Sequence, residues 1–276
     1  MNETPKELPE IRLTDRDLQK IRELAQQLEL NDSAACLTYG TAGQKKLASL
    51  ADKLFRLAGN DDSAAIGGRM NDLIRELRDF SSPKRRSGLF AWLFRKKDRK
   101  IWQKQYEAAA ESTDAIAAEL ESHRNRLLRD FVMLEKLYEG VLEQYRELTI
   151  LTEAGQRKLQ EEPSAEKEPR ERFAKRIHDL QLSRMVCMQT LTQIRILQGC
   201  STALSEKIQS LLTNTIALWK NQTALALAVK NTGQAIEELQ KAGGTMIGAL
   251  EEVHTAEADV LRESAAVMEL VQTGNE

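Results

Sequence analysis

The sequence predicts an all-α protein: an elongated antiparallel coiled-coil hairpin or bundle of long helices, preceded by a small N-terminal helical bundle. Of the 276 residues, 30% are charged, 41% are hydrophobic and only 5% are aromatic, a balance that favours long amphipathic helices over strands. Four of the five prolines fall within 5–9 and 163–169, so helix breakers are rare elsewhere. Apolar residues recur at helical spacing over long stretches, and we expect no strand.

The N-terminal part divides into a disordered tail and three short helices. Residues 1–12 are polar and contain two prolines, which is typical of a disordered tail. Thr14 and Asp17 then resemble a helix cap, and apolar residues continue to about Leu30. Two further periodic stretches, 44–58 and 63–80, end at turn-forming residues. We therefore predict a helical bundle over 13–82.

The stretch 97–276 is predicted to form the hairpin. A coiled-coil seam repeats at spacings of four and three through Leu127, Phe131, Leu134, Tyr138, Val141, Tyr145, Leu148 and Thr152. At 1.5 Å per residue, a helix over 97–162 would be roughly 100 Å long. The prolines of 162–169 predict a turn, after which a second helix over 170–241 returns along the first. We expect a kink at Gly199, a bend at Gly243-Gly244 and a last helix over 245–273.

Charge, cysteine usage and hydropathy limit the class of protein. The net charge is −2, so the chain as a whole gives no reason to expect nucleic-acid binding. Three widely spaced cysteines with no C-x-x-C pair favour a reducing compartment. We find neither a secretion signal nor a stretch long and apolar enough to span a membrane, and we expect a cytoplasmic protein.

The usual signatures of catalysis are missing from the sequence. Residues 40–46, Gly-Thr-Ala-Gly-Gln-Lys-Lys, superficially resemble a phosphate-binding loop, but the spacing is wrong and no strand precedes them. His123, His178 and His254 are far apart and have no Cys or His partner at ligand spacing. We therefore expect no enzyme activity, no cofactor and no metal site.

The junction 83–104 is strongly basic and aromatic. It holds nine Lys or Arg residues against one acid, Asp98, which gives a local net charge of +8. This composition is typical of an interfacial anchor on anionic lipid; the alternative is that the aromatic side chains pack against the N-terminal bundle. The candidate contact residues of this tip are Lys84, Arg85, Arg86, Phe90, Trp92, Phe94, Arg95, Lys96 and Lys97.

A second unusual stretch, 181–222, carries many polar residues on what should be a packed helix. Arg184 and Arg195 are eleven residues apart, which brings both to one helical face. They would either pair with carboxylates such as Glu135, Glu139 or Glu143 of the facing helix, or receive an oxyanion. The candidate network comprises Arg184, Gln189, Gln193, Arg195, Lys207, Gln209, Trp219 and Lys220.

This same stretch resembles the bacterial toxic-anion (tellurite) resistance proteins of the TelA family. The matching pieces are Gln181-Leu182-Ser183-Arg184, Gln193-Ile194-Arg195, 206–210 (EKIQS) and 218–222 (LWKNQ), with weaker similarity through Tyr39-Gly40 and the 65–80 helix. The resemblance implies a bacterial cytosolic helical protein of toxic-anion resistance, with no known catalytic mechanism. Two features depart from the family: its members usually continue past the last helix, and Gly199-Cys200-Ser201 replaces an asparagine-rich turn.

Three hypotheses follow for function. The first is a non-enzymatic helical scaffold or adaptor of the toxic-anion stress response, with a protein partner that the sequence does not identify and a candidate contact of the tip with the inner membrane surface. The second is an oxyanion-binding or sequestering protein that uses Arg184 and Arg195. The third is a thiol-dependent tellurite reductase. We disfavour it because we interpret Cys187 and Cys200 as buried structural thiols. Homo-oligomers remain open, since a long seam can pair with another chain.

Overall fold

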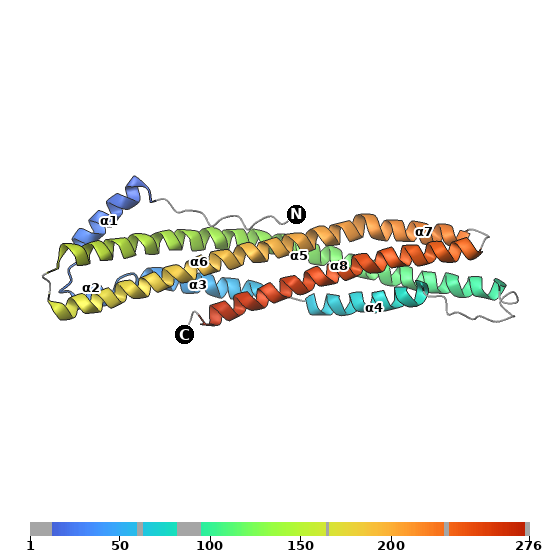
Figure 1. Cartoon of the computed structure of the whole chain (residues 1–276), viewed down its shortest axis with the longest axis horizontal. Coiled ribbons are helices and arrows are strands. Elements are labelled where there is room, and N and C mark those ends of the chain that lie inside the picture. The colour runs from blue at the N-terminus through green and yellow to red at the C-terminus, as the bar shows by residue number, and fades with distance from the viewer. Residues whose placement is uncertain (1–12, 60–62, 82–94, 164–165, 229–231, 274–276) are drawn as a thin grey trace. The chain divides into compact units, whose positions relative to one another are not determined.

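The computed structural model describes residues 13–59, 63–81, 95–163, 166–228 and 232–273, with some side chains near helix ends left out of the description (Figure 1). Throughout these ranges the regular elements are helices, and no strand occurs among them. The all-α prediction is therefore confirmed.

The described residues form a succession of helices. In chain order they are α1 (Asp15–Gln27), α2 (Ser33–Thr38), α3 (Thr41–Ala58), α4 (Ser63–Ser81), α5 (Arg95–Glu161), α6 (Lys167–Ser210), the π-helix η1 (Leu211–Thr215), α7 (Ile216–Ala228) and α8 (Thr232–Thr273). α5 has 67 residues and α6 has 44. The helix predicted over 97–162 is thus present as α5, whereas the helix predicted over 170–241 is divided among α6, η1, α7 and the start of α8.

Contacts divide the chain into two units. Unit 1 comprises Met1–Asn60, Val132–Gln198 and Glu263–Glu276, and unit 2 comprises Asp61–Phe131 and Gly199–Arg262. α5, α6 and α8 each contribute residues to both units.

In unit 1, α1 and α3 pack on the long helices α5 and α6. The Tyr39 hydroxyl, just before α3, donates a hydrogen bond of 2.8 Å to the Leu151 carbonyl of α5. A small cluster of Ile21, Ile150 and Ala154 joins α1 to α5. Residues 13–58 are thus held against the long helices as well as against one another.

Within unit 1, α6 runs back beside α5 (Figure 1) and approaches it closely. A side-chain Cβ added at Gly155 of α5 would collide with Ile177 of α6 and touch the Phe173 ring. Glycine therefore permits the close approach of the two helices at this point.

In unit 2, α4 lies against α5 and α8. Arg69 of α4 forms an ion pair with Glu119 of α5, and Arg78 forms one of 2.6 Å with Glu251 of α8. The apolar face of α4 is buried through Met70, Leu73, Ile74 and Leu77. Burial of this face is the main source of stability for a helix of this length.

Most of the predicted seam of α5 is buried. Leu127, Leu134, Tyr138, Val141, Leu148 and Thr152 are buried, Tyr145 is half-buried, and Phe131 is 37% exposed. The period of four and three thus predicted the packed face correctly, except at Phe131.

Three stretches differ from what the sequence suggested. Around Gly199 the helix continues to Ser210, and the departure from α geometry comes later, at η1. Gly243 and Gly244 lie inside α8 and form no bend. Ala242, Met246 and Leu250 are buried on that helix, and such packing outweighs the roughly 1 kcal/mol that each glycine costs a helix. Residues 33–38, which lie between the first and second predicted helices, form α2 with Asp32 as its cap.

Candidate functional site

The best-defined polar network in the candidate region centres on Arg195 of α6. Its Nη1 donates to Glu135 Oε2 at 2.6 Å and its Nη2 to Glu135 Oε1 at 3.3 Å, so the carboxylate of α5 is held by two bonds. Gln198 accepts from Arg195 Nη1 at 2.8 Å and donates to Glu135 Oε2 at 2.9 Å. Of the partners that the sequence left open for Arg195, the structure thus places the carboxylate of Glu135 beside it.

The Arg195 guanidinium also lies over an aromatic ring. Its central carbon is 3.6 Å from the centroid of the Tyr138 ring, a cation–π arrangement. Desolvation disfavours the charged form, but the bonds to Glu135 and Tyr138 outweigh it, so the pKa of Arg195 is raised above its ordinary value. Arg195 thus already has a carboxylate in the place where an external oxyanion would have to bind.

The other candidates in unit 1 are not drawn into this network. Arg184 is half-buried, and within the described ranges no hydrogen bond or ion pair engages it. Gln189 is exposed, whereas Gln193 is half-buried with an Oε1 that has no hydrogen-bond partner there. Of the two arginines that the sequence placed on one face, the structure therefore gives a carboxylate partner only to Arg195 in the part of the chain it describes.

The candidates in unit 2 serve separate contacts. Lys207 of α6 pairs with Glu252 of α8 at 3.2 Å, and Lys220 of α7 pairs with Asp114 of α5. Trp219 is 1% exposed and belongs to the core, while Gln209 is half-buried. Each of these two lysines thus meets a carboxylate on a different helix.

The histidines and thiols lie apart from these networks. His123 is buried, His178 is exposed, and His254 makes a 3.0 Å hydrogen-bond contact with Asn71. Cys36 and Cys187 are buried, and Cys200 is half-buried. Across the described ranges, no group of three or more His, Cys, Asp or Glu residues is arranged to hold a metal ion.

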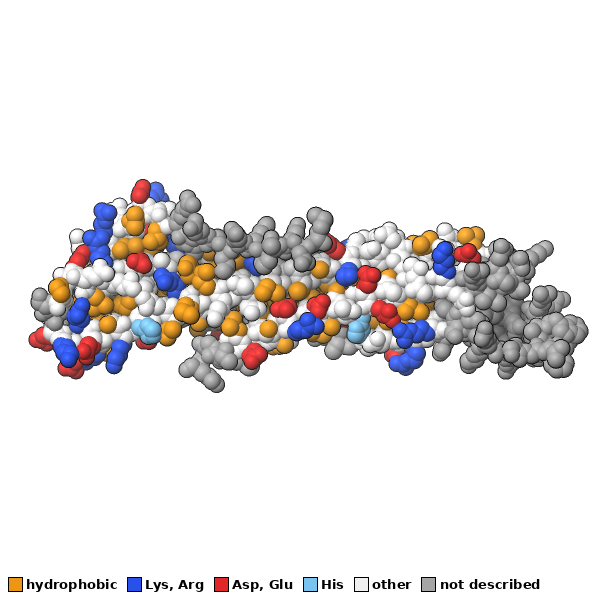
Figure 2. All heavy atoms as spheres, in the orientation of Figure 1, with side chains coloured by type: hydrophobic (Ala, Val, Ile, Leu, Met, Phe, Trp, Pro, Cys, Tyr) orange, Lys and Arg blue, Asp and Glu red, His pale blue; other side chains and the backbone are white. Residues whose placement is uncertain are grey.

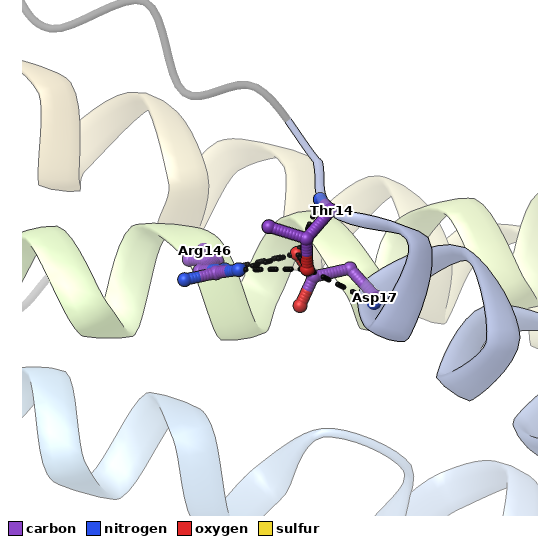
Figure 3. Close-up of polar contacts among 3 residues, drawn as sticks. All are labelled: Thr14, Asp17 and Arg146. Atoms are coloured by element: carbon purple, nitrogen blue, oxygen red, sulfur yellow. Dashed lines mark hydrogen bonds and ion pairs between the residues drawn. The ribbon is translucent and has the colours of Figure 1, made fainter.

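A polar cluster at the start of α1 was only half predicted (Figure 3). Thr14 and Asp17 form the expected reciprocal cap, in which the Thr14 backbone donates to Asp17 Oδ2 at 2.7 Å and Asp17 N donates to Thr14 Oγ1 at 3.4 Å. Arg146 of α5 then donates to Asp17 at 2.5 Å and to Thr14 at 3.1 Å. Nothing in the sequence identifies Arg146, because it is more than a hundred residues away.

The ionisation of Asp17 reflects this cluster. The hydrogen bond from Arg146, followed by that from Thr14, lowers the pKa of the Asp17 carboxyl to about 2. The charged form of Asp17 is therefore the one that holds α1 against α5.

A second cluster missed by the sequence analysis surrounds the start of α3. Arg176 of α6 donates from Nε to the Tyr39 carbonyl at 2.7 Å, and from Nη2 to Thr41 Oγ1 at 3.1 Å and Gln44 Oε1 at 2.7 Å. Gln44 in turn donates to Ser183 at 2.9 Å. These bonds fix the first turn of α3 on α6.

An open hollow lies between α4 and α8 in unit 2. It measures about 350 Å³ and is lined by Asn71, Ile74, Arg75, Arg78 and Glu251. Charged side chains of both signs lie among hydrophobic ones on the face that Figure 2 shows.

The side chains of the candidate contact residues of the basic-aromatic tip fall outside the part of the chain that the structure describes. Residues 84–94 lie outside the described residues, and so do the side chains of Arg95, Lys96 and Lys97. In the helices that the structure describes, none combines the length and apolar character needed to cross a bilayer.

Comparisons with known proteins point to one family. The model of a family described as toxic anion resistance protein (TelA) matches residues 21–252. A TelA-like protein of Staphylococcus saprophyticus is 31% identical over 249 residues, which cover 80% of this chain and 66% of the relative. An uncharacterized protein of Listeria monocytogenes is 30% identical over 281 residues (92% and 69%), and one of Bacillus subtilis is 29% identical over 264 residues (84% and 68%).

The chain thus spans about two thirds of the length of these relatives. No solved structure matches it significantly.

Proposed function

Because this chain belongs to the toxic anion resistance protein (TelA) family, we propose that it acts in resistance to toxic anions as a non-enzymatic helical scaffold or adaptor. Family membership supports the role in resistance. Tellurite is the anion that we choose for the growth assay below. The scaffold mechanism rests on the arguments that follow.

The observation that carries the proposal is the internal pairing of candidate anion ligands. Arg195, Lys207 and Lys220 each hold a carboxylate of the same chain. An external oxyanion would have to compete with that carboxylate, and at half-buried Arg195 it would also leave Glu135 without its cation, which costs free energy. Internal pairing therefore favours a structural role for these three side chains.

Exposed apolar side chains support the adaptor role. Leu182 and Met185 of α6 are 47% and 58% exposed, and their spacing of three puts them on one face of the helix. They lie within the stretch that carries the family resemblance. Exposed apolar side chains on a helix are suited to bind a partner protein.

The environment of the thiols supports a non-enzymatic role over a reductase. Desolvation by burial raises the pKa of Cys187 to about 12, and burial together with nearby Asp32 raises the pKa of Cys36. Thiolates are the reactive form of cysteine. At neutral pH both side chains are therefore held in the unreactive thiol form.

Growth under tellurite tests the scaffold proposal. In a bacterial strain that lacks its own copy, we expect the full chain to restore growth and the Leu182→Ser/Met185→Ser variant to fail, with both equally folded by circular dichroism. Glu153→Ser, an exposed residue of α5, is the matched surface control. Full protection by the double variant would contradict the proposal.

A second candidate function is oxyanion binding at Arg184. The observation that favours it is that Arg184 is half-buried and finds no hydrogen-bond or ion-pair partner among the described residues. Calorimetric titration with tellurite, compared between the natural chain and Arg184→Gln, tests it. Equal or absent heats in the two proteins would exclude this site.

Peripheral contact of the tip with the cytoplasmic membrane surface is part of the proposal. It is supported by the net charge of +8 over 83–104 and by the interleaved aromatic residues, which together suit anionic lipid. The test is flotation with anionic and with neutral vesicles, before and after Trp92→Ser/Phe94→Ser. Equal recovery of both proteins with anionic vesicles would refute the contact.

A further inference from the structure

The first turn of α3 presents an unusual concentration of positive charge. Gly40 is the N-cap of this helix, with φ of 72°, and it supplies no side-chain cap. In the described part of the chain, the backbone N–H groups of Thr41, Ala42 and Gly43 have no acceptor. Unpaired N–H groups give a helix N-terminus a partial positive charge of roughly +0.5.

Arg176 adds a full positive charge at the same place. Its three acceptors are the Tyr39 carbonyl, the Thr41 hydroxyl and the Gln44 amide oxygen, all of them neutral. Among the described residues no carboxylate lies within ion-pair distance of this half-buried guanidinium. A cation beside a helix N-terminus is electrostatically unfavourable, and an anion would relieve the repulsion.

A buried amide supplies an independent indication of a ligand. Gln144 of α5 is 0% exposed, and neither its Oε1 nor its Nε2 has a hydrogen-bond partner in the residues described. Its Nε2 reaches the first turn of α3, where it lies 2.8 Å from the position that a Cβ on Gly43 would take. A buried amide with no partner costs free energy, and an acceptor bound at this turn would recover it.

We propose that the first turn of α3, with Arg176 and Gln144, binds a small oxyanion. The donors are the N–H groups of Thr41 to Gly43, the Arg176 guanidinium and the Gln144 amide. Ala42 is exposed and Thr41 is half-buried, so solvent reaches this turn. Backbone N–H groups combined with a guanidinium are the preferred donors for oxyanions in proteins.

This site revises the expectation for residues 40–46. The sequence argued against phosphate binding because the spacing is wrong for a phosphate-binding loop and no strand precedes it, but a helix N-terminus binds anions without either feature. The inference is independent of the scaffold function and of Arg184. A failure to bind here would leave the resistance assay with Leu182 and Met185 unaffected.

Amide chemical shifts of the natural full-length chain provide the first test. Inorganic phosphate, sulfate and tellurite are titrated separately at constant ionic strength, with chloride as the control and glycerol phosphate as a phosphomonoester. We expect saturable shifts of the Thr41, Ala42 and Gly43 amides with an oxyanion and none with chloride, at a dissociation constant of about 1 mM or tighter. Binding of either inorganic phosphate or glycerol phosphate supports the site. The ranking of their two dissociation constants shows whether the site prefers a free ion or a phosphomonoester.

Variants then test the two side chains. Arg176→Gln should weaken binding at least about tenfold, whereas Arg172→Gln, one turn earlier on α6 and paired with Glu168, should leave it unchanged. Gln144→Met should not lower the melting temperature without an anion, because it removes an amide that has no partner. It should, however, reduce the rise in melting temperature that phosphate produces.

Three results would overturn the proposal: no amide shifts at α3 with any oxyanion, equal shifts with chloride, or equal weakening by Arg172→Gln and Arg176→Gln. The titration of the natural chain decides the question even if Arg176→Gln does not fold.

Discussion

Asp17 shows how a local sequence motif and a distant side chain combine at one residue. Thr14 and Asp17 are three positions apart, and this spacing predicts their reciprocal cap. The bond from Arg146 to Asp17 joins residues 129 positions apart, and no periodicity in the sequence indicates which helix α1 meets. The cap was therefore predictable, but its attachment to α5 was not.

Asp17→Asn should loosen α1 in a pH-dependent way. The folded-state pKa of about 2 lies below the ordinary value of 3.8, so the charged carboxylate stabilises the fold above about pH 4, and this contribution is lost as the pH falls through about 2. At neutral pH we expect a loss of about 1 kcal/mol in the free energy of unfolding.

Urea unfolding of both proteins over a series of pH values checks this prediction. The difference between them should vanish toward about pH 2, and Asp15→Asn, an exposed neighbour, should show a smaller, less pH-dependent change. A difference that stays constant down to this pH would contradict the assigned role of Asp17.

Arg195 and Glu135 should behave as a coupled pair. Glu135→Met leaves a half-buried guanidinium without its carboxylate, and we expect a loss of about 1–2 kcal/mol. Arg195→Met in addition should recover part of that loss, with a coupling energy of about 1 kcal/mol. A double-mutant cycle by urea unfolding measures it, and additive effects would show that the pair is not coupled.

At the scale of elements, the apolar period predicted the long helices and most of the α5 seam, because burial of a helical face repeats in the sequence. Local breakers were less reliable guides. Gly243 and Gly244 were read as a bend, yet both lie inside α8, where tertiary packing outweighs propensity. η1 has no glycine or proline to mark it.

Gly244→Ala should stabilise α8. Gly244 is exposed, and a Cβ there would meet no other atom within 4 Å. Alanine in a helix interior gains about 0.5–1 kcal/mol over glycine. Thermal unfolding should show a higher melting temperature, whereas Gly40→Ala should lower it, because φ is 72° and the Cβ would lie 2.6 Å from Leu180. A lower melting temperature for Gly244→Ala would contradict a continuous α8.

Deletion of Asn214 should be tolerated better than deletion of Asn125. A π-turn holds one more residue than an α-turn, so losing exposed Asn214 can convert η1 to regular α-helix and keep the face of α7. Losing exposed Asn125 inside α5 instead rotates all that follows by about 100°. Circular dichroism melts compare the two deletions, and equal loss of stability would contradict the assignment of η1.

At the scale of the whole chain, two observations support the proposed scaffold function. The family match covers residues 21–252, and the candidate cations Arg195, Lys207 and Lys220 pair with carboxylates inside their own units. The sequence offered both a carboxylate and an oxyanion as partners of Arg195, since charge alone does not distinguish them. Only the distance between the Arg195 guanidinium and the Glu135 carboxylate distinguishes these two partners, and that distance depends on the register of α5 against α6.

The most direct measurement of the central claim is growth under tellurite of a strain that expresses Glu135→Met/Arg195→Met. Both charges are removed together, so no unpaired charge is left at the site. The scaffold account predicts full protection, equal to that of the natural chain at the same expression level. Loss of protection by this variant, with its helical content and melting temperature retained, would contradict the account and assign Arg195 to the anion.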